Sequence, residues 1–357
     1  VYNGEKNENG EKHGRGILML PNGSVFEGEF RNNSYANGKL VYVTGEQYEG
    51  KFIDDLPDDD NGVFRFANMS VYTGQVKKGQ LTGVGELKYK DGGIYKGSFV
   101  NGKREGKGSF EFYEGNQKVR HYDGDWENDS MSGQGTLINT TIQQVYTGQF
   151  KNNVYHGQGI FNFQTRSLEF EGDMIDSRKN GFGKLVYSDG SYYEGQFNND
   201  EMTGTGSFVD SDRVYNGQFV KSLFHGKGKL KATFKSKDYV FEGEFREHQP
   251  YNGVGSVVVS RKTGDYWDGE FKNGKFSGKG RLTFEDASVY EGNVKNSLCE
   301  GKGVVTYPDG SIYSGSFSND ERHGPGTLTI KDGDEKDFMI VSINQVWDHG
   351  VLVSQEE

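Results

Sequence analysis

The sequence predicts an all-β protein, built as an elongated, single-layer antiparallel β-meander of repeated hairpins. Three observations lead to this prediction. The 357 residues include 54 glycines and 14% aromatic residues, a composition that favours strands and turns over helices. An aromatic residue with a glycine two positions later recurs along almost the whole chain. Within each recurrence the rings and glycines are two residues apart, which places them on one face of a strand.

The first strand of each hairpin is marked by the pattern aromatic-x-Gly-x-apolar. The pattern occurs fourteen times, and successive occurrences are 22 to 27 residues apart. A fixed period of this length indicates a repeat architecture. The occurrences begin at Tyr2, Phe26, Tyr48, Tyr72, Tyr95, Tyr122, Tyr146, Phe170, Tyr193, Tyr215, Phe241, Trp267, Tyr290 and Tyr313.

The second strand of most hairpins carries Gly-x-Gly-x-apolar. A glycine inside a strand leaves a gap, and a large ring on the neighbouring strand can fill it. We therefore expect one face of the sheet to consist of rings seated on glycines, with a structural role. Three units represent it: Tyr95, Gly97, Phe99, Gly106 and Gly108; Tyr193, Gly195, Phe197, Gly204 and Gly206; and Tyr313, Gly315, Phe317, Gly324 and Gly326.

Short turns link one unit to the next. Examples are Pro308-Asp309-Gly310-Ser311 and Ser188-Asp189-Gly190-Ser191. Asp-Gly between alternating runs is a strong hairpin signal and is typical of type I′ turns, whose two central residues both have positive φ. These turns predict that the chain runs as a continuous antiparallel meander.

The complete unit resembles the MORN repeat. It consists of Tyr-x-Gly-x-Phe, a loop such as residues 101–105, Gly-Lys-Gly-x-Leu and an Asp-Gly turn, and the resemblance covers about residues 2 to 330. Some units depart from the pattern: Lys6 stands where Phe is expected, and Ala36 and Asp60 replace the first Gly of their Gly-x-Gly pairs. These departures indicate either tolerated loop variation or places where the sheet bends or a partner docks.

The glycine pattern stops after Leu328. Residues 338–341, 346–347 and 351–353 then suggest a last hairpin without the motif. Because a repeat array needs an atypical terminal unit to close its final face, we predict two parts, a repeat array over residues 1–330 and a degenerate capping hairpin and tail over 331–357.

Motifs that suggest chemistry fail on spacing. Gly106-Lys107-Gly108-Ser109 lacks the spacing of a phosphate-binding loop. His13, His156, His225 and His323 each precede a Gly-x-Gly, but at least three repeat units separate them. The run at 58–62 does not align with a calcium-binding loop. The sequence therefore predicts no catalytic residues, no metal site and no cofactor, and hence a protein that is not an enzyme.

Charge and cysteine content limit the partners. The formal net charge of −11 disfavours nucleic acid and anionic membrane surfaces, which are bound mainly through Lys and Arg. The single cysteine, Cys299, cannot form an internal disulfide and favours a reducing compartment. We therefore expect a cytoplasmic protein that binds neither nucleic acid nor, directly, membrane lipid.

The strand face opposite the rings is a candidate contact surface. On the first strands of the units, half of the outward positions are acidic, from Glu5 to Glu291. On the second strands, the middle residue of Gly-x-Gly is basic in five units. The position before the ring is usually Val or Ile, which reflects either β-propensity beside a turn or a docking strip for a partner or a second copy. The candidate partner-binding residues are Val25, Val71, Ile94, Val145, Val214, Val240, Val289 and Ile312.

The resemblance implies a scaffold. Similar long MORN arrays occur in cilia and flagella, notably in radial spoke heads, and in cytoskeletons. We therefore expect a non-enzymatic protein that holds other proteins of a large assembly, as a monomer or a homodimer, in the axoneme or the cytoskeleton. A ring-lined concave groove and the two sheet edges are the expected contact surfaces. The alternative is a membrane-apposing or phospholipid-associated module, such as the regulatory part of a lipid kinase.

Overall fold

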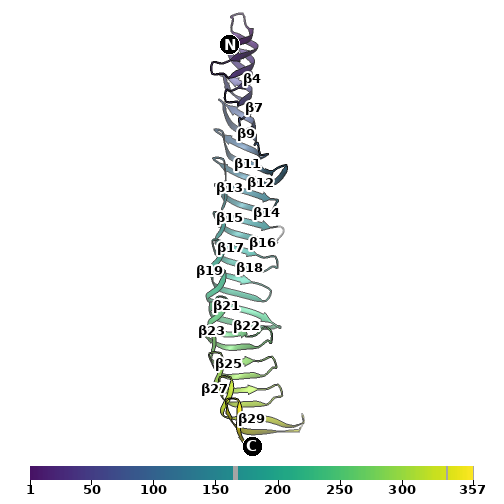
Figure 1. Cartoon of the computed structure of the whole chain (residues 1–357), viewed down its shortest axis with the longest axis vertical. Coiled ribbons are helices and arrows are strands. Elements are labelled where there is room, and N and C mark those ends of the chain that lie inside the picture. The colour runs from purple at the N-terminus through teal and green to yellow at the C-terminus, as the bar shows by residue number, and fades with distance from the viewer. Residues whose placement is uncertain (164–167, 335–336, 357) are drawn as a thin grey trace. The chain divides into compact units, whose positions relative to one another are not determined.

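The structure, a computed structural model, describes residues 1–163, 168–334 and 337–356. The chain divides into two compact units, Val1–Gly181 and Phe182–Glu357. Every regular element in the described residues is a β-strand. Within each unit, successive strands lie side by side in sequence order (Figure 1). The prediction of an all-β antiparallel meander is confirmed in both units.

The first unit is one antiparallel sheet. Each strand pairs with the next along the chain, except that the short β6 pairs with the end of β5 while β5 and β7 pair with each other. Its strands are β1 (Tyr2–Lys6), β2 (Lys12–Met19), β3 (Val25–Arg31), β4 (Ser34–Val41), β5 (Gln47–Ile53), β6 (Leu56–Pro57), β7 (Asp59–Arg65), β8 (Val71–Lys77), β9 (Gln80–Lys88), β10 (Ile94–Val100), β11 (Lys103–Glu114), β12 (Gln117–Glu127), β13 (Ser130–Asn139), β14 (Gln144–Lys151), β15 (Val154–Phe163) and β16 (Leu168–Ile175).

The second unit repeats this arrangement from β18 to β31, again with each strand antiparallel to the next. The division between the units falls within β17 (Arg178–Val186). The strands that follow are β18 (Tyr192–Asn198), β19 (Glu201–Val209), β20 (Arg213–Val220), β21 (Leu223–Phe234), β22 (Lys237–Arg246), β23 (Gln249–Val258), β24 (Tyr266–Lys272), β25 (Lys275–Thr283), β26 (Val289–Lys295), β27 (Leu298–Thr306), β28 (Ile312–Ser318), β29 (Glu321–Asp334), β30 (Asp337–Asp348) and β31 (Val351–Glu356).

The core of a typical repeat is an aromatic ring, most often tyrosine, lying over two paired glycines. In β10 and β11, Gly97 pairs with Gly108, and the ring of Tyr95 covers both. A Cβ placed on Gly97 would lie 2.5 Å from the Cα of Gly108 and 2.5 Å from the Tyr95 hydroxyl. Tyr95 is fully buried. The glycines are therefore required because the ring and the opposite backbone occupy the space of any side chain.

The buried hydroxyl of this tyrosine has a fixed partner. Tyr95 donates a 2.9 Å hydrogen bond to the carbonyl oxygen of Ser98, three residues further along the same strand. Among the described residues, eight other units make the same bond, with lengths of 2.5 to 2.9 Å. Their donors are Tyr2, Tyr48, Tyr72, Tyr122, Tyr146, Tyr193, Tyr215 and Tyr290.

The second ring of each unit joins neighbouring units. Phe99 packs edge-on against Tyr95 of its own unit and against Tyr72 of the preceding one, each with centroids 5.1 Å apart. Trp126 makes the same pair of contacts with Tyr122 and Tyr95. Such edge-to-face pairs add about 0.5–1.5 kcal/mol beyond the area they bury. Where an aromatic residue holds the second position, it therefore joins the cores of neighbouring repeats. Buried Val76, Met174 and Val294 hold that position in three other repeats.

The two glycines of each Gly-x-Gly pair have different roles, which differs from the sequence expectation. The second glycine seats the ring, but the first lies in a bulge with left-handed backbone, at φ +74° for Gly106, +56° for Gly204 and +73° for Gly324. In β11, residues 105–107 lie opposite the single residue Ser98 of β10. The expectation placed Gly106, Gly204 and Gly324 on the ring face because a period of two assumes an unbroken strand, and the bulge interrupts it.

Units that lack the first glycine have a different bulge. Where Ala36 replaces it, the register between β3 and β4 shifts by one residue rather than two. The pairing of β22 with β23 also shifts by one, so that Gly253 rather than Gly255 pairs with Gly243. Neither Ala36 nor Tyr251, which lies two residues before Gly253, has positive φ. The shorter bulge therefore does not need the left-handed conformation that favours glycine.

The Asp-Gly turns that link the units are not the type I′ turns that the sequence predicts. In the turn at Tyr307–Ser311, Gly310 has φ +82° but Asp309 does not have positive φ. The Asp309 carboxylate instead accepts hydrogen bonds from the backbone N–H and the hydroxyl of Ser311. This bonding keeps the aspartate out of the left-handed region, as in an Asx turn.

Most turns with two positive φ values lie inside the hairpins; the linking turn at Lys235 and Ser236, with φ of +49° and +61°, is an exception among the described residues. Asn152 and Asn153 have φ of +49° and +70°, as a type I′ turn requires. Asn153 also exchanges two hydrogen bonds with Met131 of the preceding unit: its side chain accepts from the Met131 N–H at 2.8 Å, and its own N–H donates to the Met131 carbonyl at 3.0 Å. Asp129 with Arg104 and Asp320 with Cys299 repeat this exchange. Each hairpin turn therefore fastens its unit to the one before.

The last repeat is followed by β30 and β31, which pair with each other. Trp347 of β30 lies 6.3 Å from Tyr313, edge-on, in the place of a second ring. Gln345 occupies the glycine position opposite Gly326, is buried, and accepts a hydrogen bond from the Trp347 indole. The side chains at 338 and 339, part of the expected cap, lie outside the described residues. The division at residue 330 stays a prediction.

Candidate functional site

The ring face does not offer its rings as a contact surface. Tyr95, Tyr193 and Tyr313 are fully buried, and Phe99, Phe197 and Phe317 are at most 7% exposed. Their contacts are with each other and with the paired glycines of adjacent strands. The expected ring-lined groove is therefore closed by its own packing at these units, and these residues form the core.

Two hollows lie on the opposite face, within the second unit. One, of about 1070 Å³, extends over β24 to β31 and is lined by Lys279, Arg281, Glu291, Lys302 and Val304, among others. A second, of about 610 Å³, extends over β20 to β23 and includes Lys227 and Glu242. We call the first of these the outer groove. Its floor is glycine backbone and its walls are the outward side chains that alternate with those glycines.

The outer groove carries both signs of charge. Lys279, Arg281 and Lys302 line it together with Asp268, Glu291 and Glu356. Arg281 and Glu291 approach to 3.6 Å across β25 and β26. The sequence predicts an acidic outward face, and in this groove the basic side chains equal the acidic ones. The groove therefore suits a polar partner of mixed charge.

Outward acids elsewhere are paired across strands. Lys107 contacts Asp125 at 2.6 Å, and Lys229 contacts Glu242 at 2.8 Å. Side chains in the second outward slot also satisfy the bulge: the Gln218 side-chain oxygen accepts from the Lys227 N–H at 2.9 Å. These side chains serve the sheet itself as well as facing solvent.

The candidate apolar positions lie on the outward face beside the linking turns. Val240 and Ile312 are exposed, by 39% and 38%, and the other six are half-buried. They do not form a continuous strip, because a charged or polar residue lies between many of them. Lys88, for example, pairs with both Val71 and Ile94. Their role in partner binding stays a prediction.

The acidic run at 58–60 is used within the fold. Asp58 contacts Lys77 at 2.9 Å, and Asp59 accepts hydrogen bonds from the backbone N–H groups of Lys51 and Asn61. Partial burial raises the pKa of Asp59, but the hydrogen bonds to its carboxylate outweigh this effect and the pKa is lowered. These contacts replace the missing glycine bulge in this unit.

Sequence reasoning missed a core position two residues before the first glycine of the pair. Arg104 fills it between three rings, with its guanidinium carbon 4.3 Å from the centroid of Trp126. Arg322 lies in the same way over Tyr313 and Trp347, at 4.2 and 4.6 Å. The signal was present, because an apolar residue or Arg precedes Gly-x-Gly at the same period of two in most units.

The repeat geometry agrees with a family model. The MORN repeat model matches eleven segments: 2–25, 72–94, 95–117, 122–140, 146–167, 170–192, 193–213, 215–232, 267–289, 290–312 and 313–335. The chain belongs to the MORN repeat family. Repeats of this family mediate protein and membrane interactions. The MORN units that begin at Phe26, Tyr48 and Phe241 are not matched, and all three have a departure from the two-residue glycine bulge.

Relatives share parts of this array. The chain is 31% identical to Alsin from Homo sapiens over 179 residues, which cover 49% of this chain and 9% of Alsin, and Alsin from Rattus norvegicus matches equally. It is 34% identical over 76 residues to MORN repeat-containing protein 3 from Xenopus laevis, covering 20% of this chain and 32% of that protein. The matches thus span about a tenth to a third of these relatives. Among the described residues of this MORN protein, no helix has the length and hydropathy to span a membrane.

Proposed function

We propose that this MORN array is a non-enzymatic scaffold that binds other proteins through its outward face. The outer groove is the observation that carries the proposal. The repeat uses its rings and glycines internally, so the side chains that remain available are the outward ones. Over β24 to β31 they surround a groove of about 1070 Å³. A groove with glycine backbone on its floor and both charges on its walls suits an extended polypeptide, which presents backbone and alternating side chains.

The finer part of the proposal concerns the assembly. We propose a cytoplasmic setting, in a ciliary axoneme of the radial-spoke kind or in the cytoskeleton, with other proteins of a large complex as partners and a homodimer as one possible form. The resemblance of the long array to MORN proteins of such assemblies supports this setting. The buried, unpaired Cys299 is compatible with a reducing compartment.

Charge reversal in the outer groove tests the scaffold. Arg281→Glu with Lys302→Glu removes two of its cations, and we expect the double variant to lose the crosslinks that native assemblies form to β25–β31, as mapped by mass spectrometry. The control is Lys295→Glu. Lys295 is the last residue of β26, which lies between the strands that carry Arg281 and Lys302, and it does not line the groove. Equal loss of crosslinks in the control would contradict the groove as the contact surface.

Membrane association is tested in the same preparation. Co-sedimentation with vesicles of phosphatidylcholine containing phosphatidylserine or phosphoinositide, at physiological salt, is expected to leave the protein in the supernatant, because acids outnumber bases by 52 to 41 and anionic lipid attracts cations. Strong co-sedimentation without protein partners would instead support the phospholipid-associated alternative.

A further inference from the structure

We propose that His323, Asp348 and His349 form a binding site for one Zn²⁺ ion at the end of the array. One ligand atom from each of these residues lies within 4.8 Å of the other two. Two imidazoles and a carboxylate are ligands that Zn²⁺ prefers, and three protein ligands leave a fourth position for water. The site goes beyond the scaffold function and does not depend on it.

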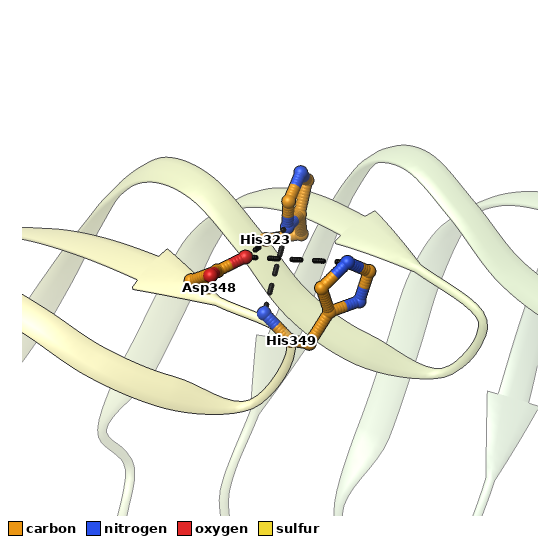
Figure 2. A group of neighbouring side chains, drawn as sticks. All are labelled: His323, Asp348 and His349. Atoms are coloured by element: carbon orange, nitrogen blue, oxygen red, sulfur yellow. Dashed lines mark hydrogen bonds and ion pairs between the residues drawn. The ribbon is translucent and has the colours of Figure 1, made fainter.

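The three side chains come from two neighbouring strands and the turn that follows them. His323 lies near the start of β29, Asp348 is the last residue of β30, and His349 is in the turn before β31. Figure 2 shows the Asp348 carboxylate joined by dashed lines to both imidazoles, which stand on the same side of the ribbon. A bound ion would therefore connect β29 to the turn between the last two strands.

The distances are close to those of a metal site. The Asp348 Oδ1 atom lies 3.5 Å from Nδ1 of His323 and 4.0 Å from Nε2 of His349. Ligand atoms around a tetrahedral zinc ion are about 3.3 Å apart, given bonds of about 2.0–2.1 Å. All three side chains are partly exposed to solvent, so small rotations about their side-chain torsions suffice to close the remaining gap.

A fourth residue lies beside one of the ligands, within reach of a hydrogen bond after a small rotation. The Glu321 carboxylate lies 3.7 Å from Nδ1 of His349, while Nε2 of the same ring faces Asp348. Histidines that bind metal typically donate their other ring N–H to a carboxylate, which fixes the tautomer that leaves the ligating nitrogen free. Glu321 is therefore placed as the outer partner of His349, independently of the three ligands.

The other repeats show what this position does without a metal. The residue before the first glycine accepts a hydrogen bond from the N–H of the next hairpin turn, as Glu105 does from Asn128 at 2.9 Å and Glu300 from Asn319 at 3.2 Å. Nδ1 of His323 accepts the corresponding bond from His349 at 3.5 Å, the longest of the three, and a Zn²⁺ ion bound at Nδ1 would replace it. One acceptor is sufficient for this bond. The second imidazole and the Asp348 carboxylate beside it are additional, and metal binding accounts for them.

The repeat supplies variants that preserve the turn. His349→Asn restores the residue found at Asn319, which has the same positive φ, and His323→Glu restores the residue found at Glu300. Neither substitution should unfold the hairpin, and both remove an imidazole ligand. His225→Glu is the matched control, because His225 holds the same repeat position and belongs to no such group among the described residues.

Calorimetric titration of the whole chain with Zn²⁺ alone tests the site. We expect one ion per chain and a loss of affinity of more than about 100-fold in His349→Asn. The loss should be smaller in His323→Glu, whose carboxylate can still bind Zn²⁺, and about 10-fold in Glu321→Gln, the typical cost of losing an outer partner. His225→Glu should bind as the unaltered chain does. The visible spectrum of the Co²⁺-loaded chain should be that of a tetrahedral site, and should disappear in His349→Asn.

Three results would overturn the proposal. They are the absence of stoichiometric binding, an affinity in His349→Asn equal to that of the unaltered chain, and one ion per two chains. Far-ultraviolet circular dichroism of each variant separates loss of the site from loss of the fold. The nitrogen chemical shifts of the imidazoles in an NMR spectrum give a second readout. The signals of Nδ1 of His323 and Nε2 of His349 are expected to change on Zn²⁺ addition.

Discussion

The Tyr95 hydroxyl donates to the carbonyl oxygen of Ser98 at 2.9 Å, whereas the hydroxyl of Tyr313, at the same position of the last repeat, is buried without a hydrogen-bond partner in the part of the chain that the structure describes. Both residues are tyrosines, and each ring lies over a pair of glycines at the equivalent positions of its own repeat. They differ in one buried polar interaction, which makes them a natural pair for measuring it.

Tyr95→Phe should destabilise its repeat by about 1 kcal/mol, because it removes one buried hydrogen bond to the Ser98 carbonyl. Tyr313→Phe should leave stability unchanged or raise it, because it removes a buried hydroxyl that has no partner. Native-state hydrogen exchange at amides of β10–β11 and β28–β29 measures each local effect, since a repeat array need not unfold in one step. Equal costs at both sites would show that the hydroxyl bond contributes nothing.

Gly108→Ala should cost about 1–3 kcal/mol by overpacking, because its Cβ would lie 2.6 Å from atoms of the Tyr95 ring. The control is Gly102→Asn in the adjacent hairpin turn. Gly102 has φ +81° and nothing within 4 Å of its Cβ position, and asparagine already occupies this turn position in another repeat as Asn153. Thermal denaturation of the two variants should therefore separate clearly. A mild effect at Gly108 would mean that the ring can move aside.

Two linking turns with the same form as Tyr307–Ser311 carry a side chain where that turn has Gly310. Met69 and Ala287 have φ of +68° and +66°, at the position of Gly310. Left-handed backbone costs a residue with a Cβ about 1–2 kcal/mol. Ala287→Gly and Met69→Gly should each raise stability, because they relieve this strain. The gain should be no more than about 1 kcal/mol, because glycine loses more chain entropy on folding. Gly310→Ala should do the reverse. Melting temperatures that fall in both glycine variants would contradict this account.

Alkaline pH should unfold the array through its tyrosines. Burial raises the pKa of Tyr72, Tyr95, Tyr146, Tyr193 and Tyr215 to about 12. Because the folded pKa exceeds the unfolded value of about 10, the stabilisation is complete below pH 10 and is lost as pH rises toward 12. Ultraviolet absorbance of tyrosinate and circular dichroism should therefore change together in this range. Ionisation of these tyrosines near pH 10 without unfolding would show that the rings are accessible.

The repeat and its meander could be predicted from sequence because the period of two between Tyr95, Gly97 and Phe99 is a property of any strand. The first glycine could not be placed in the same way. Gly106 continues the period in the sequence, but the extra residues of the bulge become visible only when the register of both strands is known. The same limit applies to Asp309, where Asp-Gly fits two turn types and the Ser311 contacts decide between them.

The candidate contact surfaces could not be predicted fully, because a sequence pattern does not show which face of the sheet is exposed and which is buried. The sequence predicts that Phe99 and Phe317 face the same side as Tyr95 and Tyr313, but whether that side is open depends on contacts between neighbouring units. His349 lies outside the repeat pattern, so its proximity to His323 follows only from the pairing of β29 with β30. Val25 and Val71 could be assigned to the outward face, but their interruption by charged residues depends on register.

The exchange of hydrogen bonds between Asn153 and Met131 has a consequence for how such an array can change length. A segment that ends at Lys151 would remove the partner of the Met131 N–H and carbonyl, although it contains the whole hairpin to which Met131 belongs. A duplicated or deleted segment keeps every such partner only if it spans a full period, wherever it starts. The length of a duplicated or deleted segment therefore matters more than its starting point, and a segment need not begin or end at a hairpin boundary.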